Sequence, residues 1–388
     1  MWFFSSPHIV FGEGALSYLE NLQGKLACIV SDDNVMRAGL VERVRSSLPA
    51  HIAVQVFTEI EPDPSLEVVR QGAAFLNQLQ PDWIIAVGGG SVLDAAKGMW
   101  ILYERPDVDP SAINPIETYG LRRKAHFIAI PTTAGTGSEM TWAIVLRDAA
   151  ERRKLGLGNR EAVPDWAILD PGMILELPPR LTVDTGLDAL THAIEGFTSA
   201  FHNDFTDGLC LHAVRLIFQY LPRCYRDGSD FEARQHMQNA AAIAGLGFGN
   251  SMAALAHGLG HSLGAVFHVP HGRAVALFLP YTIEYCAGSD PQTLRYVELA
   301  HMLGLPSETQ NAAAHSLVNA IRELEKSLGQ PLNLQELGIS RESLEQEMNL
   351  LVANALNDTQ TIMSVRVPDE GDLRRLFWAA FEGKPVDF

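Results

Sequence analysis

The chain has 388 residues, of which 47% are hydrophobic and 19% are charged, and this composition excludes a disordered, collagen-like or low-complexity protein. Its 29 basic and 46 acidic residues give a formal net charge of −17. We therefore expect no nucleic-acid partner and no charge-driven binding to an anionic membrane. At roughly 150 residues per domain, the length predicts two or three domains.

The first half of the chain alternates short apolar runs with longer amphipathic ones. Runs rich in Val and Ile predict strands at 26–31, 53–57, 83–87 and 127–131. Apolar residues at helical spacing predict a helix over 64–79, and a second, buried helix is predicted over 91–103. This alternation favours a Rossmann-like α/β domain, in which helices cover both faces of a parallel sheet.

The pattern changes after about residue 178, where a segment rich in Pro and Gly ends the strand signals. The remaining sequence is almost wholly helical in pattern, with helices predicted at 183–200, 206–221, 232–248, 251–266, 292–303, 309–328, 340–356 and 370–382. We therefore expect an α/β domain over 1–178 and an all-α domain over 179–388. Ligand sites favour such junctions and the carboxyl ends of parallel strands.

The cysteines, the N-terminus and one apolar segment bear on where the protein resides. None of the four cysteines forms a C-x-x-C pair, and the first 24 residues contain no Lys or Arg. Reduced thiols and a cytoplasmic location are the expectation. The apolar segment 237–260 is interrupted by Asn239, Asn250, Ser251 and His257, so it favours a buried helix pair rather than a membrane span.

A glycine-rich turn follows the strand at 83–87. Gly88, Gly89 and Gly90 let the backbone approach a ligand closely, and the helix expected to begin at Ser91 offers free N–H groups to a pyrophosphate. Ser91 itself has the side chain of a helix cap or a phosphate ligand. A tight strand–helix turn that binds nothing is the alternative, and no G-x-G-x-x-G motif follows any strand.

A second such turn, at 132–139, follows the strand at 127–131. It places three threonines and a serine around two glycines, which suits phosphate and ribose oxygens. Two turns of this kind at consecutive strand ends indicate one dinucleotide lying across both. Asp32, at the end of an earlier strand, is typical of a residue that binds the adenosine ribose and repels a 2′-phosphate. A helix N-cap is the alternative for this aspartate.

Carboxylate and imidazole side chains recur at helical spacing in the second half. Asp188 and His192 are four residues apart, as are His257 and His261, and His271 follows shortly before a glycine. Residues four apart share one face of a helix. One carboxylate with two or three imidazoles suits a divalent metal ion, although a single histidine on an apolar helix is more often a core residue.

These motifs in this order resemble the iron-containing (group III) alcohol dehydrogenase family. The resemblance spans about residues 8–385 and rests on GGGSVLDAAK at 88–97, PTTAGTGSE at 131–139, GLDALTHAIE at 186–195, and AHGLGHSLG with PHG at 256–272. It implies a dehydroquinate-synthase-like fold with an N-terminal nucleotide-binding α/β domain and an all-α metal-binding domain. The active site is then expected in the cleft between them.

The resemblance also implies roles for individual residues. The family's metal ligands fall on Asp188, His192, His257 and His271, and His261 falls beside the metal as a catalytic proton relay or an orienting residue. Phe248 falls on a position that lines the substrate pocket. The family's C-terminal N-P-R is replaced here by Ser364-Val365-Arg366. The cofactor-binding residues fall on Asp32, Asp63, Gly89, Gly90, Ser91, Thr132, Thr133, Thr136 and Lys154.

The implied activity is a metal-dependent alcohol dehydrogenase or aldehyde reductase that transfers hydride between a primary alcohol or aldehyde and NAD(H). Three neutral imidazoles and one carboxylate would leave a net positive charge on a divalent metal, for which the resemblance favours Fe²⁺ and the ligand types also suit Zn²⁺. NAD is expected over NADP. The alternatives are a glycerol or polyol dehydrogenase or a dehydroquinate-synthase-like lyase of the same fold, and a non-catalytic nucleotide-binding protein.

A homodimer is the expected assembly. Relatives in the family associate, and the early segment 1–12 can supply an edge strand to a partner. The other expected partner is a small-molecule alcohol or aldehyde.

Overall fold

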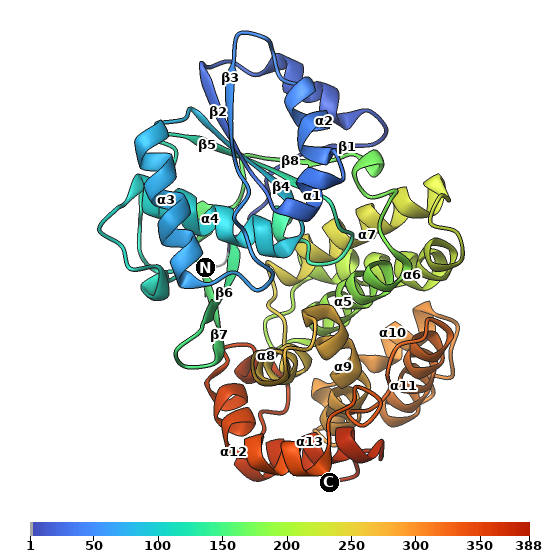
Figure 1. The fold of residues 1–388 in the computed structure, drawn as a ribbon. Helices are drawn as coiled ribbons and strands as arrows, with labels where there is room; N and C mark the ends of the chain where they lie inside the picture. The colour runs from blue at the N-terminus through green and yellow to red at the C-terminus, as the bar shows by residue number, and fades with distance from the viewer. Residues whose placement is uncertain (1–2) are drawn as a thin grey trace.

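The computed structural model describes residues 3–388, so the first two residues of segment 1–12 lie outside the described chain. A six-stranded parallel sheet forms one end of the molecule, with the strand order β1-β8-β5-β4-β2-β3 (Figure 1). The four predicted strands form, each within one residue of its expected ends. The bounds are β1 His8–Phe11, β2 Leu26–Val30, β3 Ala53–Phe57, β4 Trp83–Gly88, β5 His126–Pro131 and β8 Trp166–Leu169.

Helices cover both faces of this sheet, as the sequence predicts. Successive strand residues point to opposite faces, so Ile84 packs against the layer of α3 and α4, whereas Ile85 packs against the layer of α1 and α2. Both side chains are fully buried. The helix bounds are α1 Asp33–Arg37, α2 Leu40–Ser46, α3 Leu66–Leu79 and α4 Gly90–Glu104. The predicted parallel α/β arrangement is therefore confirmed.

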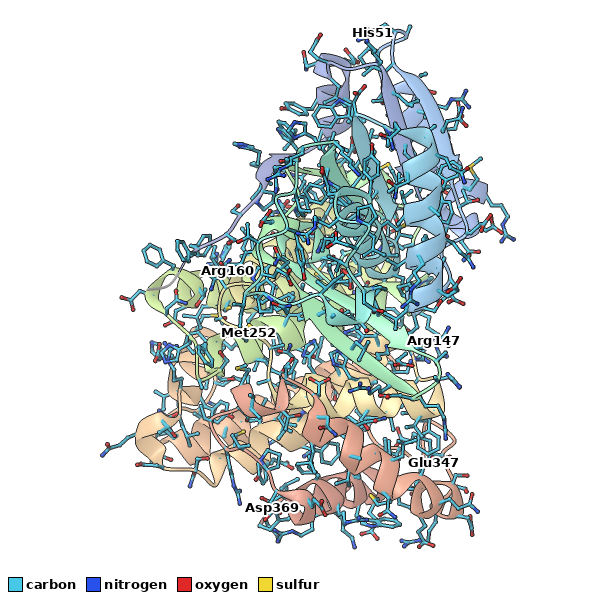
Figure 2. All side chains as sticks on the ribbon, turned by 90° about the vertical axis from the view of Figure 1, so that its left-hand side faces the viewer. His51, Arg147, Arg160, Met252, Glu347 and Asp369 are labelled. Atoms are coloured by element: carbon cyan, nitrogen blue, oxygen red, sulfur yellow. The ribbon has the colours of Figure 1, made fainter. Side chains whose placement is uncertain are left out.

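An antiparallel hairpin that the sequence analysis does not predict follows β5. Its strands, β6 Ala143–Asp148 and β7 Arg153–Gly158, leave the sheet and reach the helical half of the molecule. Arg152 at its tip forms an ion pair with Glu347 of α12, with a nitrogen–oxygen distance of 3.3 Å. Figure 2 labels Arg147 of β6 and Glu347 at the same edge of the molecule. The hairpin was missed because its apolar runs are short and six of the eight residues over 147–154 are charged.

The second half is helical and shares one large apolar core. Eight of its helices overlap predicted ranges, but α5 begins four residues earlier than expected, α6 ends five residues later, and α8 and α10 each begin four residues later. At α8 the delay arises because the chain turns sharply at Met252, whose φ is +73°. The bounds are α5 Pro179–Thr198, α6 Asp204–Arg226, α7 Phe231–Phe248, α8 Leu255–Phe267, α9 His271–Ala287, α10 Tyr296–Met302, α11 Gln310–Ser327, α12 Arg341–Asn357 and α13 Glu370–Glu382.

The sequence analysis misses helix α9. Pro270 precedes it and Pro280 lies inside it, and both residues predict a break. The helix forms because nearly all of it is buried among α5, α8, α11 and α13. Segment 237–260 proves to be the end of α7, a turn and the start of α8, and among the residues described no helix is long and apolar enough to cross a membrane. The domain division at residue 178 stays a prediction.

Candidate active site

A cavity of about 1780 Å³ lies where the carboxyl ends of the central strands face the helical half. Its walls include the turns that follow β2, β4 and β5 and residues of α5, α8 and α9. Ligand cavities in proteins commonly measure about 300–1,000 Å³, so this one has room for a molecule larger than a small alcohol. The predicted position of the site, at the junction of the two halves, is where the cavity lies.

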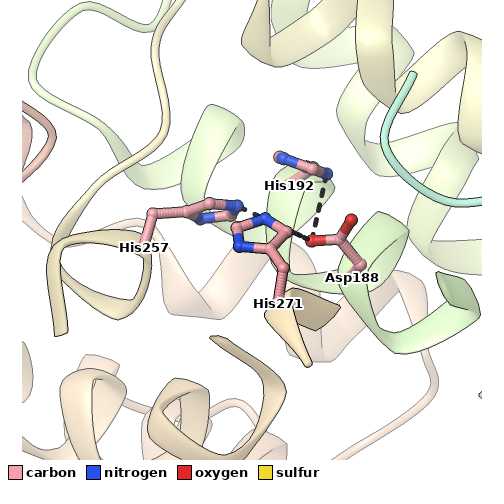
Figure 3. A group of neighbouring side chains, drawn as sticks. All are labelled: Asp188, His192, His257 and His271. Atoms are coloured by element: carbon pink, nitrogen blue, oxygen red, sulfur yellow. Dashed lines mark ion pairs between the residues drawn. The ribbon is translucent and has the colours of Figure 1, made fainter. Parts of the chain in front are cut away.

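One carboxylate and three imidazoles converge at the helical wall of the cavity (Figure 3). Asp188 and His192 come from α5, His257 comes from α8, and His271 is the first residue of α9. Asp188 Oδ1 lies 3.7 Å from His192 Nδ1, 3.7 Å from His257 Nε2 and 3.4 Å from His271 Nε2. One ligand atom from each residue lies within 4.8 Å of all the others.

The donor atoms of this cluster fit a divalent metal ion. Asp188 Oδ1, His192 Nδ1 and His257 Nε2 are buried and have no hydrogen-bond partner. Buried polar atoms are rarely left unpaired, because each costs roughly 1–3 kcal/mol without a partner. A cation among them would satisfy all three atoms at once, and imidazole with carboxylate is a donor set that iron and zinc accept.

The electrostatics of the cluster also call for positive charge. Burial lowers the pKa of His192 to about 3 and that of His271 well below the usual value, so both are neutral. Burial opposes protonation of His257 as well, but the carboxylates of Glu195 and Asp188 raise its pKa to about 9. The surrounding imidazoles hold the pKa of Asp188 below its usual range despite burial. Two neutral imidazoles beside an ionised carboxylate are therefore available to a bound cation.

Glycine and aromatic neighbours fix two of the ligands. Gly272 follows His271, and a Cβ on it would lie 2.1 Å from the carbonyl oxygen of Asp184 and 3.1 Å from Asp188 Cβ. Only glycine lets α9 begin this close to α5. The ring of Phe248 stacks on His192 at a centroid distance of 3.9 Å, so the predicted pocket residue lies against a candidate ligand.

Glu195, which the sequence analysis does not single out, contacts His257 at Nδ1, the ring nitrogen that does not face Asp188. Its Oε2 lies 2.5 Å from His257 Nδ1, and its two oxygens accept hydrogen bonds from the backbone N–H groups of Ala254 and Ala256. A second carboxylate therefore lies next to the ligands, and the expected net positive charge on a bound dication falls to about zero. Its spacing of seven residues, two helical turns, from Asp188 is the signal that could have found it.

His261 and a second missed residue, Asp358, lie beside the cluster. The ring of His261 stacks on that of His271 at 5.2 Å between centroids and lines the cavity. Its Nδ1 lies 2.7 Å from Asp358 Oδ2, at the end of α12. Burial opposes ionisation of Asp358, but the interaction and hydrogen bond with His261 lower its pKa, so the aspartate is ionised. No local pattern links these two residues, which are 97 positions apart.

The two glycine-rich turns lie side by side because β4 and β5 are neighbours in the sheet. Helix α4 begins at Gly90 rather than at Ser91, and its N-cap, Gly89, has no side chain to bond the first N–H groups. A Cβ on Gly90 would lie 2.6 Å from Thr136 Cγ2, so glycine is what allows the turns to meet. Gly89, Gly90, Ser91, Thr132, Thr133 and Thr136 all line the cavity.

Ser91, Asp63 and Lys154 form a connected group at the same wall. Ser91 is not the helix cap considered above, and its Oγ instead accepts a hydrogen bond of 3.3 Å from the backbone N–H of Asp63. Lys154 of β7 donates from Nζ to Asp63 Oδ1 over 2.5 Å. The hairpin therefore brings a cation to the cavity, and the carboxylate of Asp63 already pairs with it.

Asp32 is the N-cap of α1, which was the alternative for this residue. Its Oδ1 accepts hydrogen bonds from the backbone N–H groups of Asn34 (2.7 Å) and Val35 (3.0 Å). The residue also lines the cavity, where β2 ends. Capping uses one oxygen, so a contact to a ribose through the other is compatible with it and stays a prediction.

Comparisons with known proteins agree with this geometry. The family model "Iron-containing alcohol dehydrogenase" matches residues 6–171, and "Fe-containing alcohol dehydrogenase family, C-terminal" matches residues 182–381. The chain is 39% identical to the NADPH-dependent butanol dehydrogenase of Clostridium saccharobutylicum, over 98% of both chains. It is 36% identical to aldehyde-alcohol dehydrogenase 2 of Entamoeba histolytica over 98% of this chain, but it spans only 46% of that protein.

A solved structure shows the same fold. The crystal structure of a 1,3-propanediol oxidoreductase superimposes with a TM-score of 0.89 and 31% identity, over 98% of this chain and all of that one. The likeness covers both the sheet and the helical half.

Proposed function

The chain belongs to the iron-containing alcohol dehydrogenase family, and from this membership and the geometry of the cavity we propose that it interconverts a small primary alcohol and its aldehyde, using a divalent metal ion and a nicotinamide dinucleotide. It is an oxidoreductase of the alcohol dehydrogenase type. The observation that carries the proposal is the set of buried, unpaired ligand atoms facing the cavity beside two glycine-rich turns.

We propose Asp188, His192, His257 and His271 as the metal ligands. A bound divalent cation would supply Lewis-acid polarisation of the alcohol or aldehyde oxygen. The family name and the donor set favour iron, and zinc suits the same donors. Within the chain, Glu195 holds His257 with Nε2 toward the other ligands, and Phe248 stacks on His192 at the pocket wall. These contacts keep the ligand atoms in position before the metal arrives.

Two other parts of the chain are proposed to bind the cofactor and to accept the proton of the alcohol. We propose that Gly89, Gly90, Ser91 and the threonines of the second turn hold the pyrophosphate, which suits the free N–H groups at the start of α4. The bound nicotinamide would supply the hydride acceptor or donor. His261 lines the cavity beside the ligands, and we assign it the role of receiving the alcohol proton.

We also propose NAD as the preferred cofactor and a homodimer as the assembly. The carboxylate of Asp32 at the cavity wall disfavours a 2′-phosphate. The relative from Clostridium is named for NADPH, so both cofactors belong in the test. β1 is an edge strand, and Phe11 on it is 65% exposed, which supports pairing with a second copy. Light scattering that finds only monomer at micromolar concentration would contradict the dimer.

The experiment that tests the activity combines metal analysis with a substrate panel. Apo protein is loaded with Fe²⁺ or Zn²⁺ and assayed with 1-propanol, 1-butanol and 1,3-propanediol and their aldehydes, using NAD(H) and NADP(H). We expect about one metal ion per chain and metal-dependent turnover. A well-folded protein that binds metal but turns over no alcohol or aldehyde would refute the proposed function. His271→Ala serves as the site control, since it should lose both metal and turnover.

A further inference from the structure

Asp358, the C-cap of α12, contacts the ring of His261. Asp358 Oδ2 lies 2.7 Å from His261 Nδ1, and the two side chains are 5% and 6% exposed. His261 lines the cavity, whereas Asp358 is not among the lining residues. The other oxygen of Asp358 accepts a hydrogen bond of 2.8 Å from the backbone N–H of Gln360.

This contact determines which nitrogen of His261 bears the proton. An ionised carboxylate only accepts hydrogen bonds, so Nδ1 must donate and Nε2 of the neutral ring is left with its lone pair. Nε2 lies on the edge of the ring opposite to Asp358. The ring of His271 stacks on that of His261 at an interplanar angle of 23°.

We propose that Asp358 is a positioning residue for proton transfer, because it keeps His261 in the tautomer whose Nε2 can accept the proton of the alcohol. The inference rests on the proposed function. In the oxidation, the alcohol O–H bond breaks, its electron pair stays on oxygen, and the proton forms an N–H bond at Nε2. A bound oxidised nicotinamide would accept the hydride of the neighbouring carbon, so that the alcohol would lose two hydrogens and become the aldehyde. The carboxylate of Asp358 then faces an imidazolium and stabilises it.

The surroundings of Asp358 prevent it from moving away. A Cβ on Gly258 would lie 2.1 Å from Thr361 Oγ1, so α8 packs directly against the turn after Asp358. Thr361 Oγ1 donates to the carbonyl oxygen of Ala355, and Ser262 Oγ donates to that of Leu351, each over 2.7 Å. The first bond holds the turn against the end of α12, and the second joins α12 to α8, the helix that bears His261. The C-terminal segment, which departs from the family's N-P-R, thus still contributes a residue to the site.

The test is a double-mutant cycle of Asp358→Asn and His261→Asn in the metal-loaded enzyme, measured as alcohol oxidation. An asparagine amide can donate to Nδ1, which reverses the tautomer while it preserves size. We expect Asp358→Asn to lower kcat by about 10²–10⁴-fold. KM for the alcohol, the metal content and Tm should stay close to wild type. Asp369→Asn is the matched control, since this exposed aspartate only caps α13 and should leave kcat unchanged.

The cycle separates the inference from the function on which it rests. We expect the double variant to be no slower than His261→Asn alone, because both changes remove one and the same step. If His261→Asn is impaired while Asp358→Asn keeps kcat within about twofold of wild type, the inference alone is overturned. Losses that multiply in the double variant also overturn it, since Asp358 would then act elsewhere. An unimpaired His261→Asn overturns both this inference and the proton-accepting role of His261.

Discussion

Gly272→Ala tests whether the start of α9 must touch α5 for the metal site to form. The added Cβ would lie 2.1 Å from the carbonyl oxygen of Asp184 and 3.1 Å from Asp188 Cβ. Contacts between non-bonded atoms need about 3.5 Å, so the backbone would have to retreat by roughly 1.4 Å. The neighbour is backbone rather than a flexible side chain, and it cannot rotate out of the way.

Two effects of this retreat can be estimated. Overpacking of a buried contact typically costs about 1–3 kcal/mol of unfolding free energy. His271 immediately precedes Gly272 and would move with it, whereas metal–ligand distances tolerate only about ±0.2 Å. We therefore expect metal affinity to fall by at least about 10–100-fold, the range seen when a ligand loses its support. The loss of affinity should exceed the loss of stability.

The assay is competition for Zn²⁺ or Co²⁺ between the protein and a chelator of known affinity, together with Tm of the apo protein. Gly208→Ala is the matched control. Gly208 lies exposed within α6 with nothing within 4 Å of an added Cβ. Alanine there should stabilise the helix by about 0.5–1 kcal/mol and leave metal affinity unchanged. A Gly272→Ala protein with wild-type metal affinity would refute the steric argument for this glycine.

Three further predictions follow from contacts described above. Glu195→Gln should weaken metal binding by about 10–100-fold while the fold is kept, because the carboxylate that contacts His257 Nδ1 is lost. Wild-type metal affinity in the chelator assay would contradict this. Asp32→Asn keeps the cap of α1 but removes the charge of this side chain. The kcat/KM with NADP should therefore rise by about 10–100-fold, the equivalent of roughly 1–3 kcal/mol. A wild-type enzyme that already prefers NADP would show that this reasoning is wrong. Burial disfavours the thiolate and raises the pKa of Cys28 to about 12 and that of Cys224 to about 11. At pH 8 the native protein should therefore react with no thiol reagent, whereas the unfolded protein should react at four cysteines. Rapid alkylation of the native chain would argue against buried thiols.

The parts of the fold and site that local patterns encode could be predicted. Strands such as 53–57 are bounded runs of apolar residues, and the spacing of Asp188 and His192 puts both on one helix face whatever they pack against. Helix α9 was missed because it contains a proline, which usually breaks a helix. The sequence cannot reveal that burial on all sides compensates for the lost backbone hydrogen bond.

The residues that support the ligands were harder to find, because their partners lie far away in the chain. Glu195 contacts His257 across 62 positions and Asp358 contacts His261 across 97, so neither pairing leaves a local trace. The hairpin β6–β7 is similar, since its contact with Glu347 depends on tertiary structure rather than on its own sequence. Asp32 illustrates the opposite difficulty, because one short motif was compatible with two roles and the structure adopts the cap.

The origin of the four candidate ligands in three separate helices has a consequence for the lifetime of the protein. A metal ion held by these residues would join α5, α8 and α9 in the folded chain only, so it would act as a removable crosslink within the helical core. At a free metal concentration 100 times its Kd, such binding adds about 2.7 kcal/mol to the free energy of unfolding. If the proposed site binds metal, metal starvation would therefore expose the protein to proteolysis as well as remove its activity, and the amount of protein would follow the supply of the ion.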